Sequence, residues 1–309
     1  MRLFPLIENN DTIPLFLGGA PKCGTSSLFA ALADHPEITG SEPKETFYFL
    51  DAGHPLLARE GNVHAAGPLG HQRYFSPRGK TSFLLDGTTH LLFQQHMPEV
   101  LAEAFPSARF LFILRNPIER LRSSFAYTEN NLGRLLKPIS FAEFVGRALR
   151  GEVAELEKML APGASRYVLP RDLSYGRYDH YLANWYDHFP REQIKLVTYE
   201  AYREDSVAVV KDIIHWLQLE DSLPQKEVPR RNRTVTIRAR SLHRWVTKLS
   251  TLVPAGAVKR RLKSAYLALQ AAPPTEYPLP EELREQLRTY YSPTVTALRE
   301  MYGLQTNWS

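Results

Sequence analysis

One short segment, residues 15–34, constrains the fold of this 309-residue chain more than any other. The apolar run Leu15–Gly19 predicts a buried strand, and Thr25–Asp34 predicts an amphipathic helix. The loop between them is rich in glycine and contains Lys22. Such a turn presents backbone N–H groups and the positive end of a helix dipole to an anion. Three hydroxyl side chains follow in the first helical turn, which predicts a site for a phosphate-like group: Thr25, Ser26 and Ser27.

The rest of the chain alternates short apolar runs with helical patterns. Further strands are predicted at Ser82–Asp86, Arg109–Leu114 and Ile194–Tyr199. Helices are predicted at Pro98–Phe105, from Pro117, from Ser140 with Glu143 as a capping box to near Arg150, at Tyr178–Phe189, at Ser206–Leu219, and from Pro280 to near Gly303. This alternation predicts an α/β fold, a P-loop-like parallel sheet with helices on both faces and a C-terminal helical lobe.

Neither of two irregular stretches is typical of a domain boundary. Residues 53–79 carry glycines, prolines and three histidines and predict a long surface excursion. Residues 229–244 form the most basic segment. We therefore expect one domain over residues 1–309, with a core at 13–220 and a basic segment followed by helices at 221–309.

Composition excludes several classes of protein. The formal net charge of +5 permits an anionic ligand without requiring nucleic acid. Cys23 is the one cysteine, so neither an intramolecular disulfide nor a cysteine-based zinc cage can form, and no other metal-ligand spacing occurs. No apolar run reaches about 18 residues, the length of a membrane span. Glu8 and Asp11 interrupt the N-terminus where a signal peptide is apolar, so we expect a soluble, cytoplasmic protein.

A second anion site is predicted at the end of the strand Arg109–Leu114. Arg115 follows that strand directly, and Ser123 lies eight residues later on the next helix. The guanidinium group of arginine is a planar fork that suits phosphate oxygens. Since parallel strands place their carboxyl ends at one edge of a sheet, both anion sites are expected there, as two separate sites for a ligand with two phosphate-like ends.

The loop differs from that of nucleotide triphosphatases, G-x-x-x-x-G-K-[ST]. Gly19 and Gly24 keep the glycine spacing, but Thr25 replaces the lysine, which has moved to Lys22. A P-loop kinase with a degenerate loop is therefore an alternative, and a non-catalytic nucleotide-binding or nucleic-acid-binding module is another. The basic segment 229–244 lacks interleaved aromatic residues, so a lid over a dianionic nucleotide explains it better than a nucleic-acid surface.

Two segments, Pro21–Leu28 and Arg115–Ser123, resemble the cofactor signatures of sulfotransferases that use 3′-phosphoadenosine 5′-phosphosulfate (PAPS). The resemblance is closest to the heparan-sulfate and bacterial carbohydrate group. It implies transfer of the sulfuryl group by in-line displacement to a hydroxyl or amine, with 3′,5′-bisphosphoadenosine as the product. It also implies a carbohydrate or small-metabolite acceptor. From the residues themselves we expect no metal, no nucleic-acid partner and no integral membrane association. The oligomeric state is not indicated.

The resemblance assigns roles to individual residues. Lys22, Gly24, Thr25, Ser26 and Ser27 would hold the 5′-phosphosulfate, and Arg115 with Ser123 the 3′-phosphate. Cys23 is counted with this loop, although its thiol is expected only to fill space. Tyr178 belongs to an aromatic helix expected to pack in the core, and it could also contact the adenine. Looser matches in the basic segment would close over the phosphates: Arg231, Arg238 and Arg240.

The expected catalytic residues are Lys22, which would stabilise the leaving phosphate, and Glu45, which matches the family's catalytic glutamate and would take the acceptor proton. Glu42 and Asp86 are alternative bases, and His90 is the one histidine worth testing. Two residues differ from heparan-type members. Gly87 replaces a lysine, and Phe47 replaces a histidine.

Overall fold

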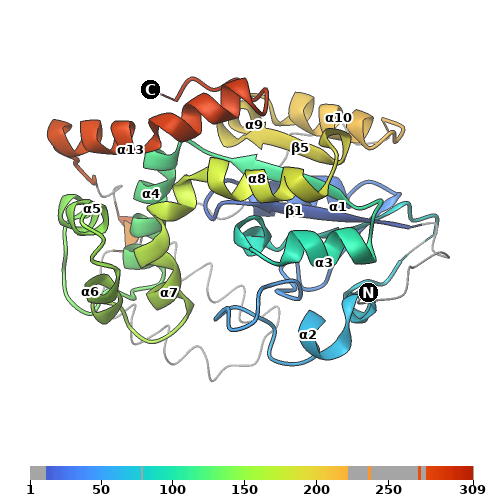
Figure 1. Ribbon diagram of the computed structural model, residues 1–309, viewed down its shortest axis with the longest axis horizontal. Coiled ribbons are helices and arrows are strands. Elements are labelled where there is room, and N and C mark those ends of the chain that lie inside the picture. Colours follow the sequence, from blue (N-terminus) through green and yellow to red (C-terminus); the bar gives the residue numbers. More distant parts are fainter. Residues whose placement is uncertain (1–11, 78, 222–235, 238–270, 273–275, 309) are drawn as a thin grey trace. The chain divides into compact units, whose positions relative to one another are not determined.

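The computed structural model describes residues 12–77, 79–221, 236–237, 271–272 and 276–308 (Figure 1). The described residues form two compact units. The first contains the residues up to Arg120, those from Tyr175 to position 221, and those from Tyr291 onward. The second contains Leu121–Ser174 and the described residues from 236 to Tyr290. The expectation of one domain over residues 1–309 stays a prediction, and Arg231, Arg238 and Arg240 lie outside the described residues.

The first unit is built on a five-stranded sheet in the order β2-β3-β1-β4-β5. Every neighbouring pair in this sheet is parallel, as the alternation of strands and helices predicted. The strands are β1 (Ile13–Gly19), β2 (Ile38–Gly40), β3 (Phe83–Asp86), β4 (Arg109–Leu114) and β5 (Ile194–Thr198). Only β2 was not expected, because its three residues are too few to show a pattern.

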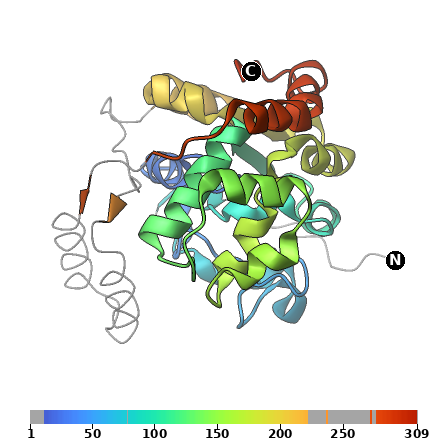
Figure 2. The ribbon, with the colours of Figure 1, turned by 90° about the vertical axis from the view of Figure 1, so that its left-hand side faces the viewer.

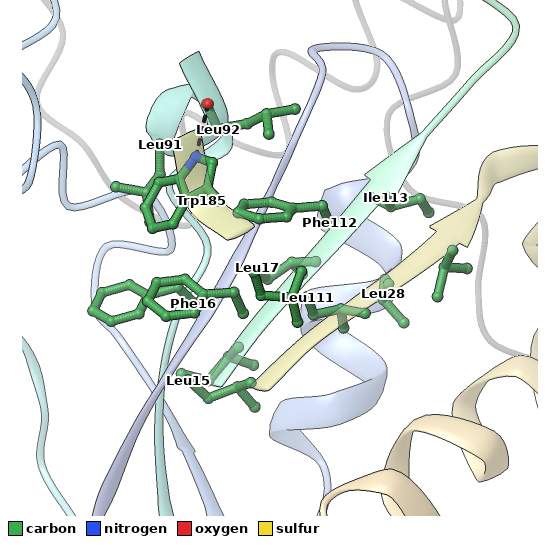
Figure 3. Packing of buried hydrophobic residues seen from close by; sticks show 14 of the residues in the cluster. Leu15, Phe16, Leu17, Leu28, Leu91, Leu92, Leu111, Phe112, Ile113 and Trp185 are labelled. Atoms are coloured by element: carbon green, nitrogen blue, oxygen red, sulfur yellow. Dashed lines mark hydrogen bonds between the residues drawn. The ribbon is translucent and has the colours of Figure 1, made fainter. Parts of the chain in front are cut away.

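Both faces of the central strands are buried, which explains why their sequences are continuously apolar. Phe110 and Phe112 of β4 pack on the indole of Trp185, with ring centroids 4.8 Å and 5.3 Å away. Leu111 lies on the other face of the sheet, where Leu28 packs (Figure 3). The indole N–H of Trp185 donates to the carbonyl oxygen of Leu92 at 3.0 Å. This bond joins the helix at residues 178–188 to the 3-10 turn at residues 89–93, which follows β3.

Helices flank the sheet of the first unit on both faces. Those of this unit are α1 (Thr25–Ala33), α2 (Val63–Ala66), α3 (Met97–Ala104), α8 (Tyr178–His188), α9 (Tyr199–Glu204) and α10 (Ser206–Trp216). Short 3-10 turns add η1 (Pro68–Tyr74), η2 (Thr89–Phe93) and η5 (Arg191–Gln193), and η4 (Ser174–Gly176) lies where the two units meet in sequence. Of the described helices, none is both long and apolar enough to cross a membrane.

The expectation of a surface excursion at residues 53–79 is wrong in part. This stretch contains α2 and η1, and four of its side chains are buried. The imidazole of His71 stacks on Phe16 at 5.9 Å and contacts Phe49 edge-on at 4.8 Å. The stretch therefore contributes to the core as well as to the surface, through Val63, Pro68, His71 and Phe75.

The second unit is mainly helical. Helix α4 (Pro117–Ala126) enters it from the first unit, and η3 (Tyr127–Asn131), α5 (Phe141–Leu149), α6 (Val153–Lys158) and α7 (Ala164–Arg171) follow, the last three packed side by side (Figure 2). Ser140 caps α5 by accepting a hydrogen bond from the Glu143 amide at 3.0 Å, which confirms the serine half of the capping box. The two-residue strands β6 (Thr236–Ile237) and β7 (Ala271–Ala272) pair antiparallel, and α13 (Glu281–Glu300) leads back into the first unit.

Gly19, the last residue of β1, has no room for a side chain. Its φ is +131°, and a Cβ there would lie 2.2 Å from the carbonyl oxygen of Ile113.

We expect Gly19→Ala to lower the free energy of unfolding by roughly 2–4 kcal/mol, from backbone strain and collision together. The matched control is Gly53→Ala, because Gly53 also has a positive φ of +82° but open space around it. Urea denaturation of both variants checks this, and equal losses would contradict the steric explanation.

Candidate functional site

The loop between β1 and α1, residues Ala20–Gly24, is called the phosphate loop below. Gly24 adopts a left-handed conformation with φ 87° at the N-cap of α1, and no side chain caps this helix end. Its carbonyl accepts from the amides of Ser27 and Leu28, so the first turn is formed. The positive end of the helix dipole at this uncapped start of α1 favours an anion beside the loop. The three predicted hydroxyl residues lie in this turn, with Thr25 and Ser27 largely buried and Ser26 half-buried.

Lys22 holds a strained position in the phosphate loop. Its φ is +71°, in a region that L-residues rarely adopt, and such strain is concentrated at functional sites. Burial, reinforced by the neighbouring charge of Arg115, lowers the pKa of Lys22 to about 8. The ammonium group therefore stays mostly charged at neutral pH, although its charged form is disfavoured. An anion bound beside it would relieve that penalty.

Cys23 is completely buried behind the loop. Burial raises the pKa of its thiol to about 12, with the nearby guanidinium groups of Arg120 and Arg115 acting in the opposite direction. The thiolate, which is the nucleophilic form, is therefore not populated at neutral pH. This agrees with the expectation that the Cys23 side chain fills space.

Arg115 reaches the phosphate loop directly. Its Nη1 donates to the carbonyl oxygen of Lys22 at 3.1 Å, and its guanidinium lies 4.8 Å from the ring centre of Tyr199. Its own carbonyl oxygen accepts from the hydroxyl of Tyr178 at 2.9 Å. Two anion sites were expected on one edge of the sheet. The structure brings Lys22 and Arg115 into a single positively charged corner there.

Tyr178 and Ser123 differ in their placement. Tyr178 is fully buried, so its hydroxyl holds the end of β4, and contact with adenine stays a prediction. Ser123 is half-buried on α4 and belongs to the second unit. Helix α4 begins where expected, at Pro117, because the side chain of Asn116 accepts from the amides of Ile118 and Glu119 at 3.0 Å and 3.2 Å.

Glu45 is held at the end of β3, the strand beside β1. Its Oε1 accepts from Lys44 Nζ at 3.1 Å and from the hydroxyl of Thr89, the first residue of η2. One third of its side chain remains exposed, 34%. Because β3 and β1 are parallel neighbours, this carboxylate and the phosphate loop lie at the same edge of the sheet. Glu45 thus combines access to solvent with a fixed orientation.

The two alternative acids have different surroundings. Glu42 is exposed. Asp86 is buried, and its carboxylate already accepts hydrogen bonds from three groups. Burial alone would raise the pKa of Asp86, but the hydrogen bond and charge of His71 and the hydrogen bonds of Thr46 and Thr88 outweigh it and hold the pKa below its ordinary value of 3.8. A buried carboxylate that is hydrogen-bonded within the protein and has a lowered pKa is poorly suited to take a proton from a substrate.

His90 is also poorly suited to be a base. It is buried in η2, near His54 and against the rings of Phe93 and Tyr175. Burial, with the charges of His54 and Arg120, lowers its pKa to about 3. The imidazole is therefore neutral at pH 7 and a weak acceptor of protons.

Lys44 occupies the space that a side chain at position 87 would need. A Cβ on Gly87 would lie 2.8 Å from Lys44 Cγ and 3.0 Å from its Cε. The ammonium group of Lys44 donates to the carbonyl oxygen of Gly87 at 2.7 Å. The cation at this turn therefore comes from residue 44. The sequence showed the missing lysine but not its replacement, because the two positions meet only in the fold.

Comparison with known proteins gives a family for this arrangement. The family model described as "Sulfotransferase domain" matches residues 13–248. The chain is 25% identical over 212 residues to the bifunctional heparan sulfate N-deacetylase/N-sulfotransferase 1 of Caenorhabditis briggsae, covering 64% of this chain and 23% of that protein. It is 24% identical over 211 residues to the human bifunctional heparan sulfate N-deacetylase/N-sulfotransferase 3, covering 67% of this chain and 22% of the relative. This chain thus spans less than a quarter of the length of these relatives.

A solved structure shares the fold over nearly the whole chain. The sulfotransferase from Alicyclobacillus acidocaldarius superposes with a TM-score of 0.63 at 21% sequence identity, covering 94% of this chain and 96% of that chain. At this identity the likeness concerns the fold. It confirms the predicted P-loop-like α/β architecture.

The buried carboxylate Asp86 makes stability depend on pH. Because its folded-state pKa lies below 3.8, its ionised form stabilises the fold above the unfolded-state pKa, and that contribution is lost as pH falls through the folded-state value. We expect Asp86→Asn to lower the free energy of unfolding by about 1–3 kcal/mol at neutral pH. The deficit relative to the parent protein should shrink below about pH 4. Urea titrations across this range provide the measurement, and a deficit independent of pH would show that ionisation is not its source.

Proposed function

Because this chain belongs to the sulfotransferase domain family, we propose that it is an enzyme that transfers the sulfuryl group of PAPS to a hydroxyl or amine of a carbohydrate or small-metabolite acceptor. The observation that carries the proposal is the corner where Arg115 bonds to Lys22 at the uncapped start of α1, on the same sheet edge as Glu45. A cationic corner beside a carboxylate suits a reaction that releases a phosphate and removes a proton.

The residues of the cationic corner fit the donor. The 5′-phosphosulfate would lie against Lys22 and the amides and hydroxyls of Gly24, Thr25, Ser26 and Ser27, with the Cys23 backbone beside them. Arg115 and Ser123 would hold the 3′-phosphate. When bound, the donor supplies the sulfuryl group and a phosphate that leaves with increased negative charge. Lys22 and the amides of α1 stabilise that charge, because they are already oriented before the reaction begins.

Glu45 would act on the acceptor. Its carboxylate takes the proton from the attacking hydroxyl or amine, while Thr89 and Lys44 keep it in one orientation. A carbohydrate acceptor is supported by the relatives, whose names identify heparan sulfate as their substrate. The kinase alternative has less support, because Thr25 stands where a P-loop enzyme has its lysine.

Replacing the proposed base separates turnover from binding. We expect Glu45→Gln to lower kcat by about 10²–10⁴-fold while leaving affinity for 3′,5′-bisphosphoadenosine unchanged. The assay follows label from radioactive PAPS to a heparan-type polysaccharide with free amines and hydroxyls, with calorimetry for binding. Glu42→Gln, the exposed acid on the same segment, is the matched control and should keep full activity. A parallel arm with ATP and magnesium tests the kinase alternative, and transfer from ATP alone would overturn the proposal.

The lowered pKa of Lys22 predicts that donor binding weakens in alkali. As pH rises through about 8, Lys22 loses its proton and with it the attraction for phosphate oxygens. The Kd for 3′,5′-bisphosphoadenosine should then rise by up to about tenfold per pH unit. Lys22→Arg, which stays charged, should remove this pH dependence even if its affinity is lower. Calorimetric titrations between about pH 7 and about pH 9.5 test this, and the same slope in both proteins would exclude Lys22 as its origin.

A further inference from the structure

A buried hydrogen-bond network lies directly behind Glu45. At its centre is Asp86, the last residue of β3, which is 2% exposed. Its Oδ2 accepts from His71 Nε2 at 2.7 Å and from the hydroxyl of Thr46 at 2.5 Å. Its Oδ1 accepts from the amide of Thr88 at 2.7 Å. His71 reaches this carboxylate from η1, so three separate segments of the chain meet at one buried charge.

The network fixes the backbone on the C-terminal side of Glu45. The amides of Thr46 and Phe47 both donate to the hydroxyl of Thr88 at 3.1 Å. The amide of Tyr48 donates to the hydroxyl of Thr46 at 3.2 Å. Thr88 and Thr46 are themselves bonded to Asp86, so each of these contacts leads back to the same carboxylate.

The opposite side of Glu45 is held to the same turn after β3. The carbonyl oxygen of Lys44 accepts from the amide of Gly87 at 2.9 Å, and Thr89 donates to the Glu45 carboxylate. Residues 87–89 therefore contact the Glu45 segment before, at and after the acid. The hydrogen bond from the Thr88 amide to Asp86 fixes the direction in which residues 87–89 leave β3.

The conformation held in this way would not persist unaided. Phe47 has a φ of +50°, a left-handed conformation that costs of order 1–3 kcal/mol for a bulky residue. Strain of this kind persists only where surrounding contacts determine the backbone. The hydrogen bond from the Phe47 amide to Thr88 is one such contact.

We propose that Asp86 and His71 are positioning residues that orient the Glu45 carboxylate through Thr46 and Thr88. The inference rests on the proposed function, in which Glu45 accepts the acceptor proton. Asp86 itself does not touch the substrate, since it is buried and both of its carboxylate oxygens accept hydrogen bonds from within the protein. His71 donates to Asp86 Oδ2 and thereby fixes the plane of this carboxylate. In that plane Oδ2 also accepts the hydrogen bond from the Thr46 hydroxyl.

The direct test is a double-mutant cycle of Asp86→Asn with Glu45→Gln. Asparagine keeps the volume, but its amide nitrogen cannot accept the hydrogen bonds that the carboxylate accepts. We expect Asp86→Asn to lower kcat by up to about 100-fold, with the acceptor KM and the Kd for 3′,5′-bisphosphoadenosine within about twofold. In the Glu45→Gln background the same substitution should change kcat by less than about twofold, because the group it positions is absent. Rates are expressed per binding-competent site from the calorimetric stoichiometry.

Two histidines provide a matched pair of variants. His71 and His35 are both buried, and His35 Nε2 bonds to the Glu220 carbonyl oxygen at 2.9 Å, at the amino end of β2. Each is changed to phenylalanine, which keeps a ring and removes the ring nitrogens. His71→Phe should lower kcat as Asp86→Asn does, whereas His35→Phe should lower only stability. If Asp86→Asn does not fold, Thr46→Val interrupts the same path at an uncharged residue.

The possible outcomes are distinct. Equal losses of kcat from Asp86→Asn in both backgrounds, or equal effects of His71→Phe and His35→Phe, would make the network merely structural and overturn the inference. Full activity in Asp86→Asn with inactive Glu45→Gln would also overturn it and leave the proposed function intact. The proposed function fails separately if the parent protein transfers no sulfuryl group from PAPS, or if Glu45→Gln remains fully active.

Discussion

The close pairing of β1 with β4 is the constraint on which the site depends. Gly19 pairs with Ile113, and the two backbones approach so closely there that only a glycine fits. The chain can therefore leave β1 beside the end of β4, where Arg115 begins the next turn. This is why one guanidinium group reaches the carbonyl of a residue 93 positions earlier and completes the cationic corner. A bulkier residue at the end of β1 would separate the two turns.

The corner holds two positive charges close together before any anion arrives. The pKa of Lys22 records this, because burial and the charge of Arg115 both disfavour its protonated form. The folded protein thus keeps two like charges close together, an unfavourable arrangement that binding of the proposed donor would offset. Glu45 differs from Lys22, because its nearest charged neighbour, Lys44, carries the opposite charge. Lys44 and Thr89 fix the orientation of the Glu45 carboxylate, and one third of this side chain stays in water. The cationic corner therefore places like charges together, whereas the Glu45 carboxylate is held by a cation and a hydroxyl group.

The sequence predicted those parts of the structure that local patterns determine. Four of the five sheet strands and the start of α4 followed from apolar runs and from the proline after Asn116, and the phosphate loop followed from its glycine spacing. The sheet edge shared by Lys22 and Arg115 was also predicted, but individual side-chain hydrogen bonds between distant segments could not be. His71 and Asp86 are 15 residues apart, and Thr46 and Asp86 are 40 apart. Neither pair forms a motif, because its two members lie on separate segments that meet only in the folded chain. The packing of the Lys44 side chain against Gly87 could not be predicted either, since it depends on where a flexible side chain lies in the folded protein.

Cys23, the single cysteine of the chain, gives the phosphate loop a chemical reporter of its own. Its thiol is completely buried and its pKa is raised to about 12, so alkylating reagents such as iodoacetamide reach it only when the loop opens. The rate of labelling under native conditions therefore measures how often β1 and α1 part at this turn. If the proposed donor binds against the loop, it would slow that rate, and mass spectrometry would measure this protection without any assay of turnover.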